Sequence, residues 1–352
     1  MIRACRSLRV VCACAPFAAA PLAAQQAPHA RLDTIPVASV DFYGLRTISD
    51  SVARQALRIP TGVRVPGAAA RAAAIARVEA LPGVRHATID AVCCATAGGI
   101  MLYVGVVESG APTMYFDPPP GGSIRLPAPV GAAGVAFDRA FEDAIAHGDF
   151  AESDSAGHAL MHWPAARAVQ IRFVDLAARY APELRNVLQH SGDAGQRALA
   201  AQVLAYSADK AAVVGDLATA LRDPDATVRN NATRALAVIA MFAHLHPRLG
   251  IHVPYGPLVA MLDSPVWTDR NKSSLALAQI TASRDPALFA LLRARALPAL
   301  TEMARWFNLS HAGPALAILG RLAGMSDAAI YSTLQRGDRA PILDAAKRIA
   351  PR

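Results

Sequence analysis

The chain has 352 residues, with 35 Lys and Arg against 27 Asp and Glu and a formal net charge of +8. This length exceeds what one compact domain usually needs, so two or three domains are expected. Hydrophobic residues make up 53% of the chain while Trp and Tyr are scarce, which favours close-packed helices built from small side chains. The charges are too evenly balanced to indicate a nucleic-acid-binding protein, because such proteins concentrate Lys and Arg on one face.

Residues 1–24 have the pattern of a secretory signal peptide. A basic segment, MIRACRSLR, precedes the short apolar stretch VVCACAPFAAA, and PLAA places small residues before a cleavage position near Ala24. No later stretch approaches the roughly 18 uninterrupted apolar residues of a membrane span. We therefore expect an exported protein, periplasmic if the source is Gram-negative, with a short linker over 25–35. The alternatives are a secreted protein or an outer-membrane lipoprotein, since Val11-Cys12-Ala13-Cys14 loosely matches a lipobox.

The cysteines separate into two groups. Cys5, Cys12 and Cys14 belong to the signal segment, whereas Cys93 and Cys94 remain in the mature chain. Adjacent strand residues point to opposite faces, so a bond between these two would be strained. One buried and one exposed thiol are expected; a vicinal disulfide and an intermolecular link are the alternatives. Two adjacent cysteines do not predict a metal cluster.

Residues 36–108 predict a small α+β domain with the order β-α-α-β-β. VASVDFYGL alternates apolar and polar residues up to Gly44 and reads as a strand. Two helices should follow, over 47–58 with Thr47 or Ser49 as cap, and from Pro66 to about Leu81. Two further strands are expected over 84–92 and 100–108.

This stretch resembles a POTRA domain, a module of outer-membrane assembly, secretion and division proteins. The resemblance implies protein binding, because an exposed sheet edge can accept an extended segment of another chain. The alternative is a small α+β domain whose edge is covered by the rest of the chain. The positions that match are Val40, Phe42, Gly44, Leu57, Gly62, Leu81, Gly83, Val84, Ala87, Val107 and Glu108.

Residues 109–134 are rich in proline and glycine and predict a semi-extended connector without helix. The rest of the chain, 135–352, predicts helices. Apolar spacing and Pro or Ser start signals place them at 135–147, 164–180, 182–190, 208–221, 257–262, 286–307 (bent or divided), 326–336 and 339–349.

A repeated pattern runs through this helical part and is clearest in LRDPDATVRNNATRALAVIA, residues 221–240. Asp223 and Pro224 predict a helix start, with Asp223 as the N-cap. Val228, Ala232 and the apolar residues that follow recur at three- and four-residue spacing. Similar patterns occur around Arg197, Arg270 and Ala312; with Arg229 as the equivalent position here, the steps are 229−197=32, 270−229=41 and 312−270=42 residues. The last two are near the roughly 40–47 residues of stacked two-helix units, and the shorter first step fits a trimmed unit at the start of the array.

The repeated unit resembles a HEAT repeat, so the resemblance implies a mainly α fold, an α-solenoid of HEAT-like or armadillo-like repeats. Such units stack into one continuous core and leave an extended binding surface. Asp and Arg four residues apart support a helix, and in HEAT proteins a similar arrangement links adjacent units as a ladder. The residues assigned to that structural role are Asp193, Arg197, Asp225, Arg229 and Arg270.

Polar and aromatic residues of the repeats are candidates for protein binding. Asn230 and Asn271 occupy equivalent positions in successive repeats, with Arg234 and Lys272 nearby. They would line a polar groove, or satisfy loops between helices. Arg305 and Trp306 are further candidates, because Trp and Arg often anchor interfaces, although Trp306 would equally suit the core.

One cluster has metal-binding chemistry. His158 and His162 are four residues apart, with Glu152 and Asp154 upstream, and on a helix this spacing places two imidazoles on one side. Ala159 replaces the glutamate of a metalloprotease motif, and ordinary solvated histidines are the simpler interpretation. No nucleotide-binding loop, hydrolase elbow or paired Cys-x-x-Cys motif occurs in the sequence.

The sequence therefore predicts a non-enzymatic adaptor or scaffold of the bacterial cell envelope, with protein partners and no cofactor. Partners would bind the sheet edge of 36–108 and the solenoid face of 135–352. A metal-dependent or enzymatic helical domain using Glu152, Asp154, His158, His162 and His311 is the second hypothesis. A structural protein that oligomerises through the solenoid is the third.

Overall fold

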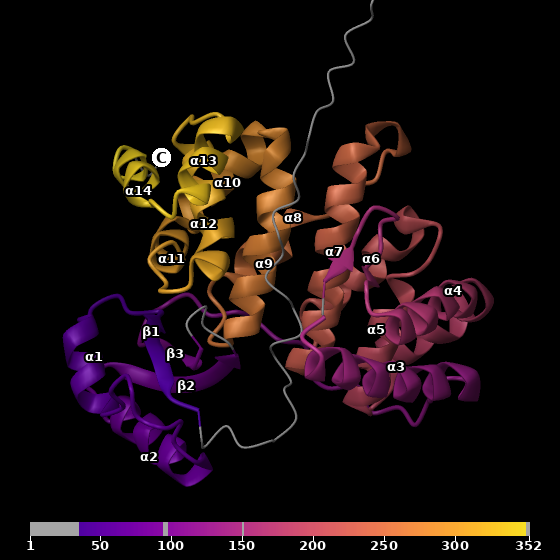
Figure 1. Cartoon of the computed structure of the whole chain (residues 1–352), viewed down its shortest axis with the longest axis horizontal. Helices are drawn as coiled ribbons and strands as arrows, with labels where there is room; N and C mark the ends of the chain where they lie inside the picture. The colour runs from indigo at the N-terminus through magenta and orange to yellow at the C-terminus, as the bar shows by residue number, and fades with distance from the viewer. Residues whose placement is uncertain (1–34, 94–97, 150, 350–352) are drawn as a thin grey trace, which may run out of the picture.

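The computed structural model describes residues 35–93, 98–149 and 151–349. Their fold is mainly helical, with a small three-stranded mixed sheet near the N-terminus (Figure 1). The predicted signal segment 1–24, most of the linker and Cys94 lie outside the described residues. The N-terminal elements have the predicted order β-α-α-β-β: β1 (Val37–Tyr43), α1 (Asp50–Leu57), α2 (Ala68–Glu79), β2 (Val84–Cys93) and β3 (Ile100–Glu108).

The third strand of this unit is the centre of the sheet. β3 pairs in parallel with β1 and antiparallel with β2, which gives the order β1-β3-β2. Every residue of β3 is buried. An uninterrupted apolar strand of this kind needs cover on both faces, and the chain provides two different covers. On one face Leu102 and Val104 pack with Leu57 of α1 and Val78 of α2.

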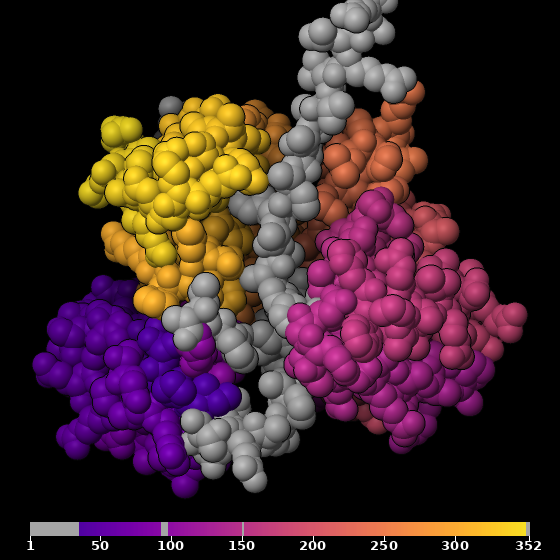
Figure 2. All heavy atoms as spheres, viewed as in Figure 1, coloured from indigo at the N-terminus to yellow at the C-terminus, as the bar shows by residue number. Residues whose placement is uncertain are grey.

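The opposite face of the sheet packs on the helical part of the chain. Tyr103 stacks on Trp267 with ring centroids 4.9 Å apart, and Trp306 approaches Tyr103 edge-on at 5.1 Å. The hydroxyl of Tyr43 donates to the carbonyl oxygen of Pro265 at 2.8 Å. Figure 2 shows the resulting contact, with the N-terminal unit in indigo against the later helices in orange and yellow. The sheet is therefore part of the same core as the helices.

The turn between β1 and α1 is held by a buried carboxylate. Gly44 has a φ of +83° and no room for a side chain beside the Val106 carbonyl, so only glycine fits there. Glu108 accepts hydrogen bonds from the amides of Arg46 at 2.8 Å and Thr47 at 2.9 Å. Burial alone would raise the pKa of Glu108, but these amides outweigh it and lower the pKa. Ser49 then caps α1 by accepting from the Val52 amide.

The prediction that 109–134 contains no helix is wrong. Helix α3 (Ala128–Ala146) begins within that stretch, because Pro129 occupies one of its first two positions, where a missing N–H costs nothing. The extended part before it lies against later helices. The Asp117 amide donates to the Arg222 carbonyl at 2.8 Å, and the Gly122 amide donates to the His190 carbonyl at 3.0 Å. A β-carbon at Gly122 would overlap that carbonyl oxygen.

The segment after α3 forms two short paired strands, β4 (Glu152–Ser153) and β5 (Leu160–Met161). A 27-residue helix, α4, then joins the two predicted helices of 164–190 across a non-helical Tyr180, two residues before Pro182. The remaining helices are α4 (Pro164–His190), α5 (Ala194–Leu204), α6 (Lys210–Ala220), α7 (Ala226–Leu245), η3 (Pro247–Leu249), α8 (Tyr255–Met261), α9 (Trp267–Ile280), η4 (Thr281–Ser283), α10 (Pro286–Arg295), α11 (Leu297–Met303), α12 (Leu309–Leu322), α13 (Asp327–Gln335) and α14 (Ala340–Ala346).

Two start signals have different outcomes. The predicted N-cap Asp223 is wrong, because Asp225 caps α7 by accepting from the amides of Thr227 and Val228. The side chain of Asp223 is instead engaged by Arg197 of α5. Ser326 does cap α13 as predicted. The predicted long helix 286–307 is divided into α10 and α11 at Ala296.

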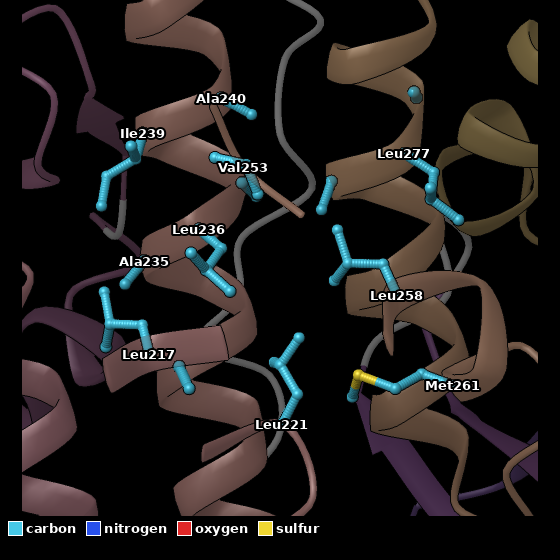
Figure 3. Close-up of a cluster of buried hydrophobic side chains, with 14 of the residues drawn as sticks. Leu217, Leu221, Ala235, Leu236, Ile239, Ala240, Val253, Leu258, Met261 and Leu277 are labelled. Carbon is cyan, nitrogen blue, oxygen red and sulfur yellow. The ribbon is translucent and has the colours of Figure 1, made fainter. Parts of the chain in front are cut away.

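The helices pack in the order of the chain. α5 contacts α7, α7 contacts α9, and α9 contacts α12, while α6, α8 and α11 pack beside the helix that follows each of them. Figure 3 shows part of the core between α6, α7, α8 and α9, including Leu217, Leu236, Leu258 and Leu277. Among the described residues, no helix is both long enough and apolar enough to cross a lipid bilayer.

Candidate functional site

Buried ion pairs connect successive helices. The guanidinium of Arg197 on α5 forms two hydrogen bonds with Asp223, at 2.7 and 2.9 Å. Arg229 on α7 pairs with Asp269 of α9 at 2.9 Å, and both side chains are almost fully buried. Arg270 on α9 reaches Glu302 of α11 at 3.4 Å. A buried charge needs a partner, so each arginine fixes its own helix against the next acidic segment.

The aspartates predicted to pair within a helix have other roles. Asp193 caps α5 by accepting from the Gln196 amide, and it forms a 3.6 Å ion pair with Arg125. Asp225 caps α7, as described above. The acceptors Asp223, Asp269 and Glu302 come from neighbouring segments. The sequence carries no local sign of these partners, because they lie 26 to 40 residues from their arginines.

The predicted helical His site does not form, because Glu152, Asp154 and His158 lie on β4 or between β4 and β5, and His162 directly follows β5. Glu152 forms an ion pair with Arg234 of α7. The Nδ1 of His158 lies 3.3 Å from Nζ of Lys210, and burial together with the lysine charge lowers the pKa of His158 to about 4. His162 is exposed. Within the described ranges, no three His, Cys, Asp or Glu side chains are placed to hold a metal ion.

A groove of about 710 Å³ extends across α3, α5, α7 and the start of α9, and Asn230 and Arg234 are among the residues that line it. We call it the amide groove, because four Asn and Gln side chains are among the residues that line it. They share it with two stacked rings of α3, Phe137 and Phe141. The polar residues that line it are Asp90, Asp138, Glu152, Gln196, Gln202, Thr227, Asn230, Asn231, Arg234 and Thr268.

Two polar atoms of the groove residues are buried without a partner among the described residues. They are the Oδ1 of Asn230 and the Nε of Arg234. The amide nitrogen of Asn230 donates to Asn231 at 3.3 Å, and Asn231 in turn donates to the Ala198 carbonyl at 3.0 Å. A buried polar atom without a hydrogen bond is costly. Two residues that line the groove thus have an acceptor and a donor whose hydrogen-bonding capacity is unused among the described residues.

The sheet contributes a carboxylate to the same groove. Asp90 of β2 accepts from the Trp267 amide at 3.2 Å and lies 3.5 Å from the Tyr43 hydroxyl. Burial raises the pKa of Asp90, against the lowering effect of these two donors. With Asp138 on α3, two carboxylates line the groove in addition to Glu152, which is paired with the lining arginine, Arg234.

The other predicted binding residues lie elsewhere. Lys272 is buried, and burial followed by the charge of Arg234 lowers its pKa to about 7. Asn271, on the next turn of α9 after Thr268, is half-buried and does not line the amide groove. Trp306 is only 1% exposed and belongs to the core, as its alternative interpretation held. Arg305 lines a separate pocket.

Sequence reasoning found Asn230 and Arg234 but missed most of their neighbours. Asn231 lies beside Asn230 on α7, whereas Gln202, Asp138 and Asp90 come from three other elements. Periodicity marks Asn231 and Gln202 only as positions outside the apolar stripe. No pattern within one helix shows which polar faces meet.

The sheet edges differ in how much of their backbone is engaged. The amide of Val37 on β1 donates to the Val63 carbonyl at 2.7 Å, and the Gly62 amide donates to the Val37 carbonyl at 2.8 Å. Part of the β1 edge is thus covered by the loop between α1 and α2. On β2 the Ala87 amide donates to a side chain, Glu79, at 3.0 Å.

No protein-family model matches this chain, and no curated protein is significantly similar to it.

Proposed function

We propose that this chain is a non-enzymatic, protein-binding adaptor of the bacterial cell envelope. It combines a POTRA-like domain with a HEAT-like solenoid and holds an extended segment of a partner protein in the amide groove. Export rests on the signal-like pattern of residues 1–24. The mature protein acts outside the cytoplasm, in the periplasm of a Gram-negative cell.

The packing of the helices supports the HEAT-like part of this proposal. Alternate helices α5, α7, α9 and α12 lie side by side, as the corresponding helices of stacked two-helix units do. The ion pairs from Arg197, Arg229 and Arg270 to the following segments have the role expected of a ladder. The order β-α-α-β-β and the mixed sheet support the POTRA-like part.

The observation that carries the binding proposal is the unpaired Oδ1 of Asn230 in the amide groove. An extended peptide offers an N–H and a C=O at every residue, so its main chain suits a row of Asn and Gln side chains. Phe137 and Phe141 supply apolar contact next to this row. Asp138 and Asp90 favour a partner segment that carries a basic side chain.

The sheet is a second, smaller contact surface for the same partner class. Because the β1 edge is partly paired with 62–65, an added strand would use β2. The face of the sheet is unavailable, since β3 is buried on both sides.

Site-specific photo-crosslinking tests the proposal. A photoreactive residue at Gly131 replaces a glycine that lines the amide groove and has nothing within 4 Å of an added β-carbon. Gly215 on α6 is the matched control, since it has equal space but lies outside the groove. We expect discrete adducts with envelope proteins from position 131 and none of these from 215.

The specificity of the adducts provides the decisive comparison. Asn230→Arg places a large charged side chain among the residues that line the groove, so it should abolish the adducts formed at position 131. The proposal fails if position 131 gives no adduct in the native host, or if Asn230→Arg leaves the adducts unchanged.

A further inference from the structure

A second pocket lies where the N-terminal unit meets the last helices, away from the amide groove. Its volume is about 390 Å³, which is within the range of small-molecule sites. We call it the junction pocket. Its walls come from the turn after β1, from α9, from α11 and from the C-terminal end at α14: Gly44, Leu45, Arg46, Arg270, Leu297, Pro298, Ala299, Thr301, Glu302, Arg305, Ala346 and Ile349.

Three guanidinium groups and one carboxylate line this pocket. The carboxylate, Glu302, is already engaged on both oxygens: Oε1 accepts from the Leu45 amide at 3.1 Å, and Oε2 lies 3.4 Å from Arg270. Arg270 is almost fully buried, donates to the Ser264 carbonyl at 2.7 Å, and lies over the Tyr43 ring at 4.7 Å. Glu302 and Arg270 therefore form a neutral, fixed wall.

The remaining two arginines leave the pocket with an excess of positive charge. Arg46 has one long contact, 3.4 Å to Asp263, and its side chain is 37% exposed. Within the described part of the chain, the guanidinium of exposed Arg305 has neither an ion-pair nor a hydrogen-bond partner. The backbone under Arg46 is held in place, because Glu108 accepts from its amide at 2.8 Å.

The rest of the lining is mostly apolar. Leu297, Pro298 and Ala299 come from the first turn of α11, and Ala346 and Ile349 come from the end of the chain. An arginine fork matches the oxygens of a carboxylate or a phosphate. We propose that the junction pocket binds a small organic anion, with its carboxylate or phosphate between Arg46 and Arg305 and its apolar body against α11 and Ile349.

Calorimetric titration of the full chain tests this site with hexanoate and phenyl phosphate as probes. We expect at least one of them to bind, and the neutral hexanamide to bind at least tenfold more weakly than hexanoate. Arg305→Gln and Arg46→Gln should each weaken binding of the stronger probe by tenfold or more. Arg336→Gln is the matched control, because this exposed arginine at the C-cap of α13 does not line the pocket and its side chain donates a hydrogen bond to Ser332, and it should leave the affinity unchanged.

The same titrations distinguish the two possible head groups and measure the contribution of the apolar body to binding. Preference for hexanoate assigns a carboxylate ligand, and preference for phenyl phosphate assigns a phosphate ester. The proposal is overturned if neither probe binds, if hexanoate binds and hexanamide binds as tightly, or if phenyl phosphate binds and inorganic phosphate binds as tightly. It is also overturned if Arg305→Gln binds the stronger probe as tightly as the wild type. This variant remains informative even if Arg46→Gln disturbs the turn after β1. The result is independent of adducts in the amide groove.

Discussion

His311, at the start of α12, is a buried titratable side chain that contacts the sheet. It is only 8% exposed, and its Nδ1 lies 2.7 Å from the hydroxyl of Tyr103 on the sheet. Trp267 meets its ring edge-on at 5.0 Å. Burial, followed by the charge of Lys272, lowers the pKa of His311 to about 4. The imidazole is therefore neutral in the folded protein at neutral pH and shares a hydrogen bond with the tyrosine hydroxyl.

This lowered pKa gives a pH-dependent stability. In the unfolded chain His311 has its ordinary pKa near 6.5, so between pH 6.5 and pH 4 it is protonated in the unfolded state and neutral in the folded state. The unfolding free energy is therefore highest above pH 6.5 and falls as the pH drops towards 4. We expect His311→Gln, which keeps an acceptor, to reduce the loss of unfolding free energy between pH 7 and pH 5 by about 2 kcal/mol. Urea titrations at both pH values measure it. His252→Gln, at an exposed position, should keep the wild-type profile, and an unchanged profile in His311→Gln would refute the assignment.

At the scale of elements, the buried pair of Arg229 and Asp269 should dominate the connection between α7 and α9. Arg229→Met leaves the Asp269 carboxylate buried without its partner, so we expect a loss of about 3 to 5 kcal/mol in unfolding free energy. Arg222→Met removes an exposed ion pair with Asp117 and should cost no more than about 1 kcal/mol. Denaturant midpoints of the two variants give the comparison, and equal losses would contradict the structural role of the buried pair.

The sequence predicted those elements whose bounds depend on local signals. It failed for elements whose bounds depend on partners far away in the chain. The strand 100–108 and the Ser326 cap were predicted because periodicity and capping are local. Asp223 is an equally good local cap, yet Arg197 engages its carboxylate and the helix begins at Asp225 instead. The segment 152–162 forms a hairpin, and its Glu152 pairs with Arg234 on α7. The four-residue spacing of His158 and His162 would place the two imidazoles on one side only in a helix, and this segment is not helical.

At the scale of the whole molecule, the sheet and the helices should unfold together, because they share one core. Trp267 and Trp306 both lie in that contact, so their fluorescence in a Trp163→Phe background reports on it. We expect the thermal transition seen by fluorescence to coincide with the transition seen by far-ultraviolet circular dichroism, which follows mainly the helices. A fluorescence transition several degrees lower would mean that the sheet separates first.

The arrangement of the two parts could not be predicted from the sequence. A Pro/Gly-rich stretch between them favoured separate modules, but residues 109–127 lie against the helices instead, with Asp117 and Gly122 bonded to later carbonyls. The apolar run of β3 predicted a strand. It did not predict that the second face of this strand packs against Trp267 and Trp306. The two pockets could not be predicted from the sequence either, because each is lined by side chains from at least four segments.

The double burial of β3 has a consequence for the order of folding. The hydrogen-bond partner of Tyr103, His311, lies 208 residues further along the chain, and the partner of Asp41, the Phe307 amide, lies 266 residues further. In a chain made from its N-terminus, α1 and α2 cover one face early, while the other face stays bare until α12 has been synthesised. Contacts this distant slow folding, and an exposed apolar sheet invites association with other chains. A nascent chain therefore needs protection over most of its synthesis.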